Sequence, residues 1–366
     1  MPCMMMMFNK TIDKLSIIEN KTVYLLAVTL ITLVAALTYP FYCYGETCSN
    51  HLCRIINSRP IFGIVLPSSP TSIGFYLSKL KLIHSYKVGK MTFYYGKLYH
   101  ISVVISVPPP IGDFSYVSID TYLLEKLFDP KFIVDPGTAG SHVSFLSMGD
   151  VLIGARIVNY TNYMTSRRGR IQPGEFSSLV TDDEGYTLGN PNPVYLYSDP
   201  DLVNLAYTAA LQVAKYTPAN ILHSITGRRP WIVKYGTQGS GTIWFRDPTQ
   251  IKQNSSIFHE DDEAGDFPIA LISTENKIPF VEIHTISDSA LNVPTKIGKY
   301  FHLCSVFAQN RSNKIVVRMI KMVAHGYRIV GTFAGGFEDP YSNSIRNKLI
   351  PPKYIYRWTM ENGIKR

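Results

Sequence analysis

The chain is poor in charged residues and in cysteine, and no internal repeat is visible in it. Charged residues make up 17% of the 366 amino acids, apolar residues make up 46%, and there are 5 cysteines. A disordered chain has the opposite balance of charge and apolar content, so this composition indicates a folded protein. The length allows one large domain or two smaller ones.

Motifs for nucleic-acid binding are also missing. There is no zinc-finger spacing, no recognition-helix pattern and no aromatic RNA-binding motif. The net charge of +9 favours anionic partners or an anionic membrane face, yet the basic residues are scattered. The exception is the run from Arg167 to Arg170, whose polar, glycine-containing surroundings are typical of a solvated loop. We therefore expect no nucleic-acid partner.

The cysteines offer few candidate ligands for a metal ion. Cys43, Cys48 and Cys53 lie close together, and His51 is the one further ligand near them. A disulfide between Cys48 and Cys53 is the better expectation, in an oxidising compartment. We expect neither a metal nor a cofactor.

An apolar run near the N-terminus has the length of a membrane span. Val23 to Leu37 consists of apolar residues and threonine and continues through aromatic residues to Tyr44. About twenty such residues suffice to cross a bilayer core. Lysines precede the run, which favours a cytoplasmic N-terminus, and the segment before the run is long for a signal peptide, which favours an uncleaved anchor. A cleaved signal peptide, cut near Val34–Ala36, is the alternative. The main domain is then extracytoplasmic, or secreted after cleavage.

The remainder of the chain alternates strand and helix patterns. Period-2 or apolar runs predict strands at 61–66 and 131–134, and a hairpin at 90–107 with its turn at Gly96–Lys97. Helical spacing predicts helices at 117–128, 201–216, 268–276 and 300–324. This order implies an α/β protein with a mixed sheet covered by helices, and ligands at the carboxyl ends of strands.

These patterns divide the chain into successive parts. We expect a cytoplasmic segment at 1–22, the anchor or signal at 23–44, a cysteine-containing linker at 45–58, the main domain at 59–326 and a C-terminal extension at 327–366.

Two motifs stand where predicted strands end. The first is the small-residue segment Asp135–Ser141, which is expected to form a turn with free backbone N–H groups, suited to an anion or a sugar oxygen. The second is Ser287–Asp288, at the end of the apolar strand that begins at Ile278. A Gly-Asp turn at Gly149–Asp150 leads into a further strand.

Together the two motifs resemble the nucleoside phosphorylase and nucleosidase superfamily, and the likeness extends in order from Arg59 to Gly326. The resemblance implies a three-layer α/β/α fold, a nucleoside substrate, phosphate as a co-substrate in phosphorylases, and a homo-oligomer. Cleavage of the N-glycosidic bond needs an acid near the purine N7, which the resemblance assigns to Asp288. A helix-capping role is the alternative reading of this residue.

The resemblance also implies a set of substrate-binding residues, some of which have plain structural readings. The glycine-rich segment is either a phosphate or water site or a packing turn, and the aromatic pair either stacks on the base or fills the core. An acidic pair stands near the place of the family's ribose-binding Glu, with a solvated loop as the alternative. The implied residues are Gly137, Thr138, Ala139, Gly140, Trp244, Phe245, Glu263, Asp266 and Ser287.

The sequence departs from the family pattern in its catalytic partners. The loop from Pro67 to Ser72 carries no water-activating Glu, the loop from Val107 to Gly112 carries no phosphate-binding Arg, and His284 stands where the family has Arg. A single His on a strand is more often structural than catalytic. Three functions stay open: an enzyme that cleaves nucleosides by phosphorolysis or hydrolysis, an inactive extracytoplasmic relative that binds or stores them, and an anchored interaction protein whose pocket has decayed.

Overall fold

In the computed structural model the chain divides after Ser58, and the described residues all belong to the compact unit Arg59–Arg366. The structure describes residues 60–66, 70–109, 114–143, 146–161, 163–165, 167–168, 171–173, 195–215, 230–243, 245, 247–258, 260–263, 265–289, 301–329 and 333–341. The predicted anchor at 23–44 and the clustered cysteines lie outside these residues. Within the described ranges, no helix combines the length and apolar character that a bilayer crossing requires.

The main unit alternates strands and helices, as the sequence predicts. Its strands are β1 (Phe62–Val65), β2 (Lys81–Val88), β3 (Met91–Leu98), β4 (Ile101–Val107), β5 (Phe132–Ser141), β6 (Val151–Asn159), β7 (Tyr163–Thr165), β8 (Ile171–Pro173), β9 (Tyr195–Tyr197), β10 (Ile232–Ser240), β11 (Glu260–Glu263) and β12 (Phe280–Ser289). Its helices are α4 (Pro70–Leu77), α5 (Phe114–Phe128), α6 (Pro200–Lys215), α8 (Pro248–Phe258), α9 (Asp266–Glu275) and α10 (Phe301–Ala324).

A mixed sheet runs through the centre of the unit in the order β11-β10-β6-β12-β5-β1-β4-β3-β2. β5 pairs in parallel with β1 and β12, whereas β12 pairs antiparallel with β6. β11 also pairs antiparallel with β5, so β5, β12, β6, β10 and β11 close into a ring. This closure brings the 261–263 segment beside β5.

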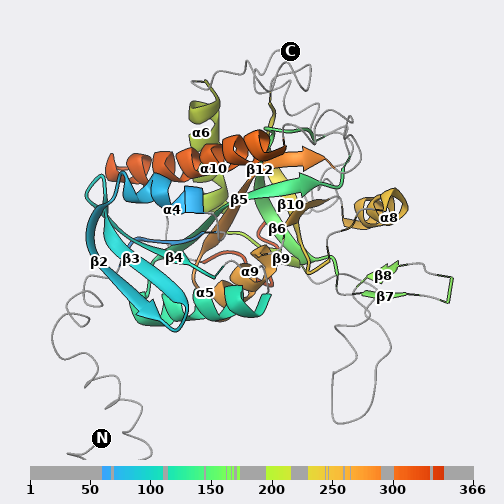
Figure 1. Ribbon diagram of the computed structural model, residues 1–366, viewed down its shortest axis with the longest axis horizontal. Helices are drawn as coiled ribbons and strands as arrows, with labels where there is room; N and C mark the ends of the chain where they lie inside the picture. The colour runs from blue at the N-terminus through green and yellow to red at the C-terminus, as the bar shows by residue number, and fades with distance from the viewer. Residues whose placement is uncertain are drawn as a thin grey trace, which may run out of the picture. The chain divides into compact units, whose positions relative to one another are not determined.

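Helices cover both faces of the sheet, which confirms the three-layer α/β expectation (Figure 1). α10 lies on one face with α4 and α6, and α5 and α9 lie on the other. The core under α10 is apolar, with Val134, Ile283 and Ile315 fully buried. The predicted helices α5, α6, α9 and α10 are confirmed within three residues at each end.

Asp-Pro pairs start two of the helices. The Asp199 carboxylate accepts hydrogen bonds from the backbone N–H groups of Asp201 and Leu202, at 3.0 and 3.2 Å, and Pro200 is the first residue of α6. Asp247 caps α8 in the same way through the N–H of Thr249 at 2.9 Å. An acidic cap followed by proline suits the unsatisfied N–H groups of a helix start. α8 was not predicted, because its mostly polar sequence hides the apolar period.

The predicted turn of the β3–β4 hairpin is wrong in position. Gly96 lies inside β3, and the turn is formed by Tyr99 and His100, both with positive φ values of 48° and 63°. Two such residues form a tight hairpin loop. Gly96 has another role, because a Cβ there would lie 2.7 Å from the backbone oxygen of Lys81 on the adjoining strand. The glycine permits a close approach of β2 to β3.

Gly96→Ala is therefore expected to destabilise the protein by about 1–3 kcal/mol, since the clash is with backbone that cannot rotate away. Gly74→Ala is the matched control, because a Cβ on this exposed α4 residue meets nothing within 4 Å. It should stabilise by up to about 1 kcal/mol through helix propensity. Chemical denaturation measures both; equal effects of the two changes would contradict the account.

A buried carboxyl group joins α5 to α9. Glu125 accepts hydrogen bonds from the hydroxyl of Ser273 at 2.7 Å and from the side-chain amide of Asn276 at 2.5 Å. Burial raises the pKa of Glu125 to about 7, against the lowering effect of these hydrogen bonds and of Lys126. The folded protein thus holds a proton that the unfolded chain releases near pH 4.5.

Because the pKa of Glu125 is raised on folding, its contribution to stability is present at low pH and is lost as pH rises from about 4.5 to about 7. Glu125→Gln mimics the protonated form and does not titrate. We expect the variant to gain stability relative to the native protein between pH 5 and pH 8, by up to about 3 kcal/mol. Unfolding free energies measured across this range test it, and a constant difference would refute it.

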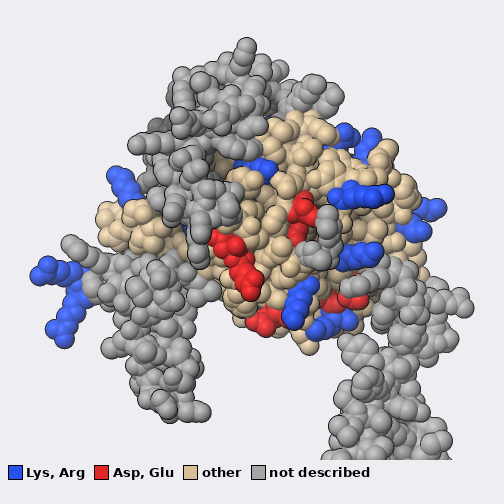
Figure 2. Space-filling view, turned by 180° about the vertical axis from the view of Figure 1, so that it is seen from behind, with Lys and Arg blue, Asp and Glu red and all other residues tan. Residues whose placement is uncertain are grey.

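One face of the unit is shown in Figure 2, seen from behind the view of Figure 1. On its described part, Lys and Arg side chains stand singly or in small groups, and Asp and Glu side chains lie toward the centre of the face. This part of the face carries no continuous basic surface, and the net positive charge is dispersed over it.

Candidate functional site

Asp288 lies at the end of β12, next to the end of β5. It is paired with Gly140 across the two parallel strands, after a bulge that follows Ile286. Asp288 is partly exposed, whereas Ser287 beside it is buried. Asp288 also raises the pKa of the Cys304 thiol, second to the effect of burial, which places its carboxylate near the start of α10.

The Ser287 hydroxyl holds this strand end together. Its oxygen lies 2.9 Å from Oδ2 of Asp288 and 3.2 Å from the backbone oxygen of Ala139. One hydroxyl proton is shared between these two acceptors. Ser287 therefore fixes the Asp288 carboxylate relative to β5. The two predicted motifs do meet, as adjacent ends of adjacent strands.

The predicted turn at Asp135–Ser141 is wrong, because β5 continues as a strand through Ser141. Residues 133–141 pair with β12, and Gly140 and Ser141 also pair with β11. The backbone N–H groups of this segment are therefore engaged in strand pairing. Thr138 and Gly140 are partly exposed and Ala139 is buried, so alternate residues of the segment reach the surface.

Polar residues of α10 support the same segment from one face of the sheet. Gln309 donates from Nε2 to the backbone oxygen of Pro136 at 2.9 Å, and Ser312 donates to that of Gly137 at 2.8 Å. Thr285 of β12 lies 2.8 Å from the Ser312 hydroxyl. Sequence reasoning missed Gln309 and Ser312, although two polar side chains three positions apart on the buried face of this helix were the available signal.

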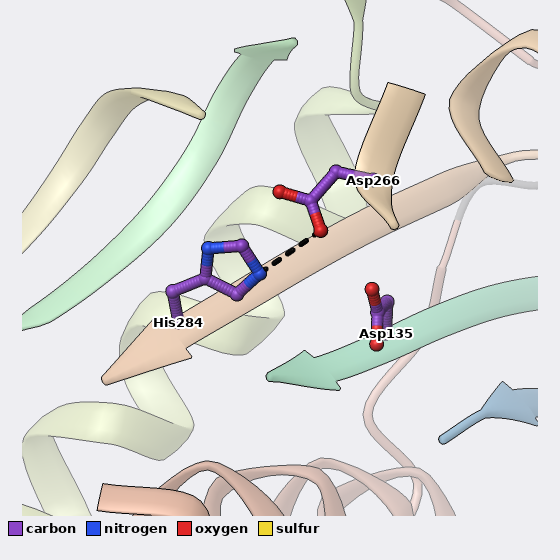
Figure 3. Close-up of side chains that lie close together, drawn as sticks. All are labelled: Asp135, Asp266 and His284. Atoms are coloured by element: carbon purple, nitrogen blue, oxygen red, sulfur yellow. Dashed lines mark ion pairs between the residues drawn. The ribbon is translucent and has the colours of Figure 1, made fainter. Parts of the chain in front are cut away.

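His284 is the centre of a buried ion-pair cluster. Its Nδ1 lies 2.9 Å from Oδ2 of Asp261 on β11, and its Nε2 lies 3.1 Å from Oδ1 of Asp266 at the start of α9 (Figure 3). All three side chains have 0% exposure. Burial by itself lowers the pKa of His284, but the two carboxylates outweigh burial and raise it well above its ordinary value.

Of the two readings of the acidic segment from Asp261 to Asp266, the solvated loop is wrong for Asp261 and Asp266, which are both buried. Asp261 lies on a strand between β10 and β5, and Asp266 begins a helix. Burial raises the pKa of Asp261 to about 6, against the lowering effect of His284. The segment looks solvated in the sequence because its acidic residues carry no apolar period, and only the closure of β11 onto β5 buries it.

Gly137 makes room for the imidazole. A Cβ on Gly137 would lie 2.8 Å from both Cδ2 and Nε2 of His284. The His284 ring crosses β5 at this glycine to reach β11. The close approach of the His284 side chain explains why this position is a glycine. A bound anion is not needed to explain it.

The other predicted site residues are placed less directly. Phe245 is buried in a cluster with Tyr160, Ile251 and Phe258, so it is a core aromatic. Trp244 lies outside the described residues. Glu263 ends β11 and pairs with Ser240, and its side chain lies outside the described set.

Arg311 on α10 has a buried guanidinium group near the predicted turn at Gly149–Asp150. The sequence reasoning missed this residue. It donates from Nη1 to the backbone oxygen of Gly149 at 2.6 Å. Burial lowers the pKa of Arg311 to about 10, against the raising effect of Asp150. Asp150 in turn accepts hydrogen bonds from the N–H groups of Ser147 and Trp231, at 2.8 and 2.7 Å.

The fold and the paired strand ends define a three-layer α/β protein of nucleoside phosphorylase type. A family model, the phosphorylase superfamily, matches residues 62–321, which is well over half of the sequence. The chain therefore belongs to the phosphorylase superfamily.

The curated relatives it resembles are 5'-methylthioadenosine/S-adenosylhomocysteine nucleosidases. The protein from Marinomonas sp. is 24% identical over 210 residues, covering 56% of this chain and 75% of the relative. The protein from Staphylococcus epidermidis is 34% identical over 80 residues, covering 22% of this chain and 34% of the relative.

Solved structures show the same fold. A nucleosidase of this kind from Neisseria meningitidis, in complex with methylthio-immucillin-A, has a TM-score of 0.52 at 18% identity and covers 72% of this chain and 99% of its own. The futalosine hydrolase of Helicobacter pylori has a TM-score of 0.53 at 15% identity, with 73% and 99% covered.

Gly137→Ala is expected to destabilise the protein by about 1–3 kcal/mol, because His284 is pinned on both ring nitrogens and cannot move aside. The same substitution made in a His284→Ala background should cost less, since the ring it meets is gone. A double-mutant cycle of unfolding free energies measures this coupling. Additive effects would mean that the ring does not lie over Gly137.

Proposed function

We propose that this domain cleaves the N-glycosidic bond of a nucleoside, with Asp288 assisting departure of the base. The observation that carries the proposal is the meeting of Ser287–Asp288 with the exposed face of Thr138 and Gly140 at adjacent strand ends. Membership of the phosphorylase superfamily and the nucleosidase relatives support it.

The chemistry assigned to Asp288 is that of an acid beside the base. As the bond from the ribose carbon to the base nitrogen breaks, its electron pair moves into the heterocycle. A proton or hydrogen bond given by Asp288 to the purine N7 stabilises this charge. Water or phosphate then forms the new bond to the ribose carbon, and the proton lost from the attacking group replaces the one that left with the base.

Ser287 and Thr138 have supporting parts in this proposal. Ser287 orients the Asp288 carboxylate through the 2.9 Å contact. The backbone oxygen of Ala139, which also accepts from the Ser287 hydroxyl, restrains that hydroxyl. Thr138 and Gly140 supply the surface on which the ribose, and phosphate or water, are held. Asp266 is fully buried against His284 and acts as a positioning residue under this surface, where it does not contact the ribose.

The competing function is binding without turnover. The Pro67–Ser72 loop holds no carboxylate to activate water, and this favours a relative that binds nucleosides without cleaving them. Under either function we propose that the domain is extracytoplasmic, anchored by 23–44 or secreted after cleavage there, and that it forms a homo-oligomer.

The test is base release from adenosine, inosine, uridine and methylthioadenosine, with and without phosphate. Asp288→Asn keeps the shape of the side chain but cannot give a proton, so we expect kcat to fall by roughly 10²–10⁴-fold. Ser287→Ala should lower it less, because it loosens the carboxylate without removing it.

Asp129→Asn is the matched control, an exposed acid with a positive φ of 45° that asparagine tolerates. It should leave turnover unchanged. Nucleoside binding without base release by the native protein supports the inactive relative. If the native protein neither binds these nucleosides nor releases their bases, both functions are contradicted.

A further inference from the structure

The buried cluster around His284 has the composition and shape of a metal site. Oxygen atoms of Asp135 and Asp266 and a ring nitrogen of His284 all lie within 4.8 Å of one another. They come from β5, from the start of α9 and from β12, so they join segments that are far apart in the sequence. Figure 3 shows the Asp266 carboxylate directed at the imidazole, with Asp135 on the neighbouring strand.

Several atoms of this cluster lack a hydrogen-bond partner among the described residues. Oδ1 of Asp135 and Oδ2 of Asp266 have none, and the contact of Nε2 of His284 with Asp266 has an ion-pair distance without hydrogen-bond alignment. The Asp266 side chain is fully buried and Asp135 is 5% exposed. Buried polar atoms left in this state are costly, and a cation bound among them would give these oxygens a partner.

The imidazole is already oriented as a ligand. Asp261 lies 2.9 Å from Nδ1 of His284, and Nε2 faces Asp266 and Asp135, where a metal ion would take the place of its proton. A carboxylate that holds the far nitrogen of a histidine is the usual outer support of a metal-binding imidazole. Gly137 makes room for the ring in this position, because a Cβ there would lie 2.8 Å from both Cδ2 and Nε2.

The charge balance points the same way. Three carboxyl groups, of Asp135, Asp261 and Asp266, face one imidazole in the described cluster. A divalent cation supplies positive charge that the single imidazole does not.

We propose that Asp135, Asp266 and His284 bind one divalent transition-metal ion, Zn²⁺ in the first instance, with Asp261 as the positioning residue for the imidazole. One nitrogen with two carboxylate oxygens is a donor set for Zn²⁺ or Mn²⁺, whereas Ca²⁺ and Mg²⁺ take oxygen ligands. Zinc bonds of about 2.0–2.2 Å put tetrahedral ligands roughly 3.3–3.6 Å apart, so small side-chain rotations complete the site.

The metal would be structural, because the site is closed to solvent and joins β5, β12 and α9 beneath the strand ends. The sequence reasoning expected no metal, since it searched for cysteine and histidine spacings. This proposal stands apart from the proposed function, and its tests use no catalytic readout.

The first experiment measures the metal content of the purified full chain after dialysis, and titrates the metal-free protein with Co²⁺, whose visible absorption reports tetrahedral binding. We expect one metal per chain and a lower Tm after chelation. Asp266→Asn should weaken Co²⁺ binding roughly 100-fold or more, and Asp261→Asn roughly 10–100-fold. Glu125→Gln is the control, a buried carboxyl beside α9 outside the cluster, and it should bind as the native protein does.

Two results would overturn the proposal. The first is a native protein that holds no saturable metal and whose Tm is indifferent to chelator and to added Zn²⁺ or Mn²⁺; the cluster is then neutralised by protons. The second is native-like Co²⁺ binding by both Asp266→Asn and Asp135→Asn, which would place the metal elsewhere. The native measurements stand even if a variant fails to fold.

Discussion

The buried imidazole of His284, held between Asp261 and Asp266, is the interaction on which the arrangement of strand ends depends. It crosses β5 at Gly137 and reaches β11, while α9 begins at its other nitrogen. Four segments from 135 to 284 are thereby fixed at one place. Removal of one partner would leave buried charge unpaired, which is among the costliest changes a core can suffer.

The cluster around His284 fixes the position of Asp288 relative to β5. The strand that carries His284 continues for four residues to Asp288, and the strand that carries Gly137 continues beside it to Gly140. α10 secures the same region from the opposite face through Gln309 and Ser312. The fully buried layer around His284 thus supports the partly exposed strand ends at Asp288 and Gly140. Only these strand ends are available to a substrate.

Much of this fold is visible in the sequence, because apolar runs mark β5 and β12 and helical spacing marks α5, α6, α9 and α10. The Ser287–Asp288 position is readable for the same reason, as polar residues that end a buried strand. The cluster is not readable, since Asp261 and Asp266 stand in a run of acids that looks solvated. The burial of Asp261 follows from β11 pairing with β5, a contact between residues some 120 positions apart.

The central claim is that the strand ends above His284 form a base-binding rim with Asp288 at its edge. A crystal structure of the protein with adenine bound tests it most directly. The account predicts the Asp288 carboxyl group at hydrogen-bond distance, about 3 Å, from N7 of the base, with the Asp261–His284 contact intact. Adenine bound away from Asp288, or a side chain of Asp288 turned from the base, would contradict it.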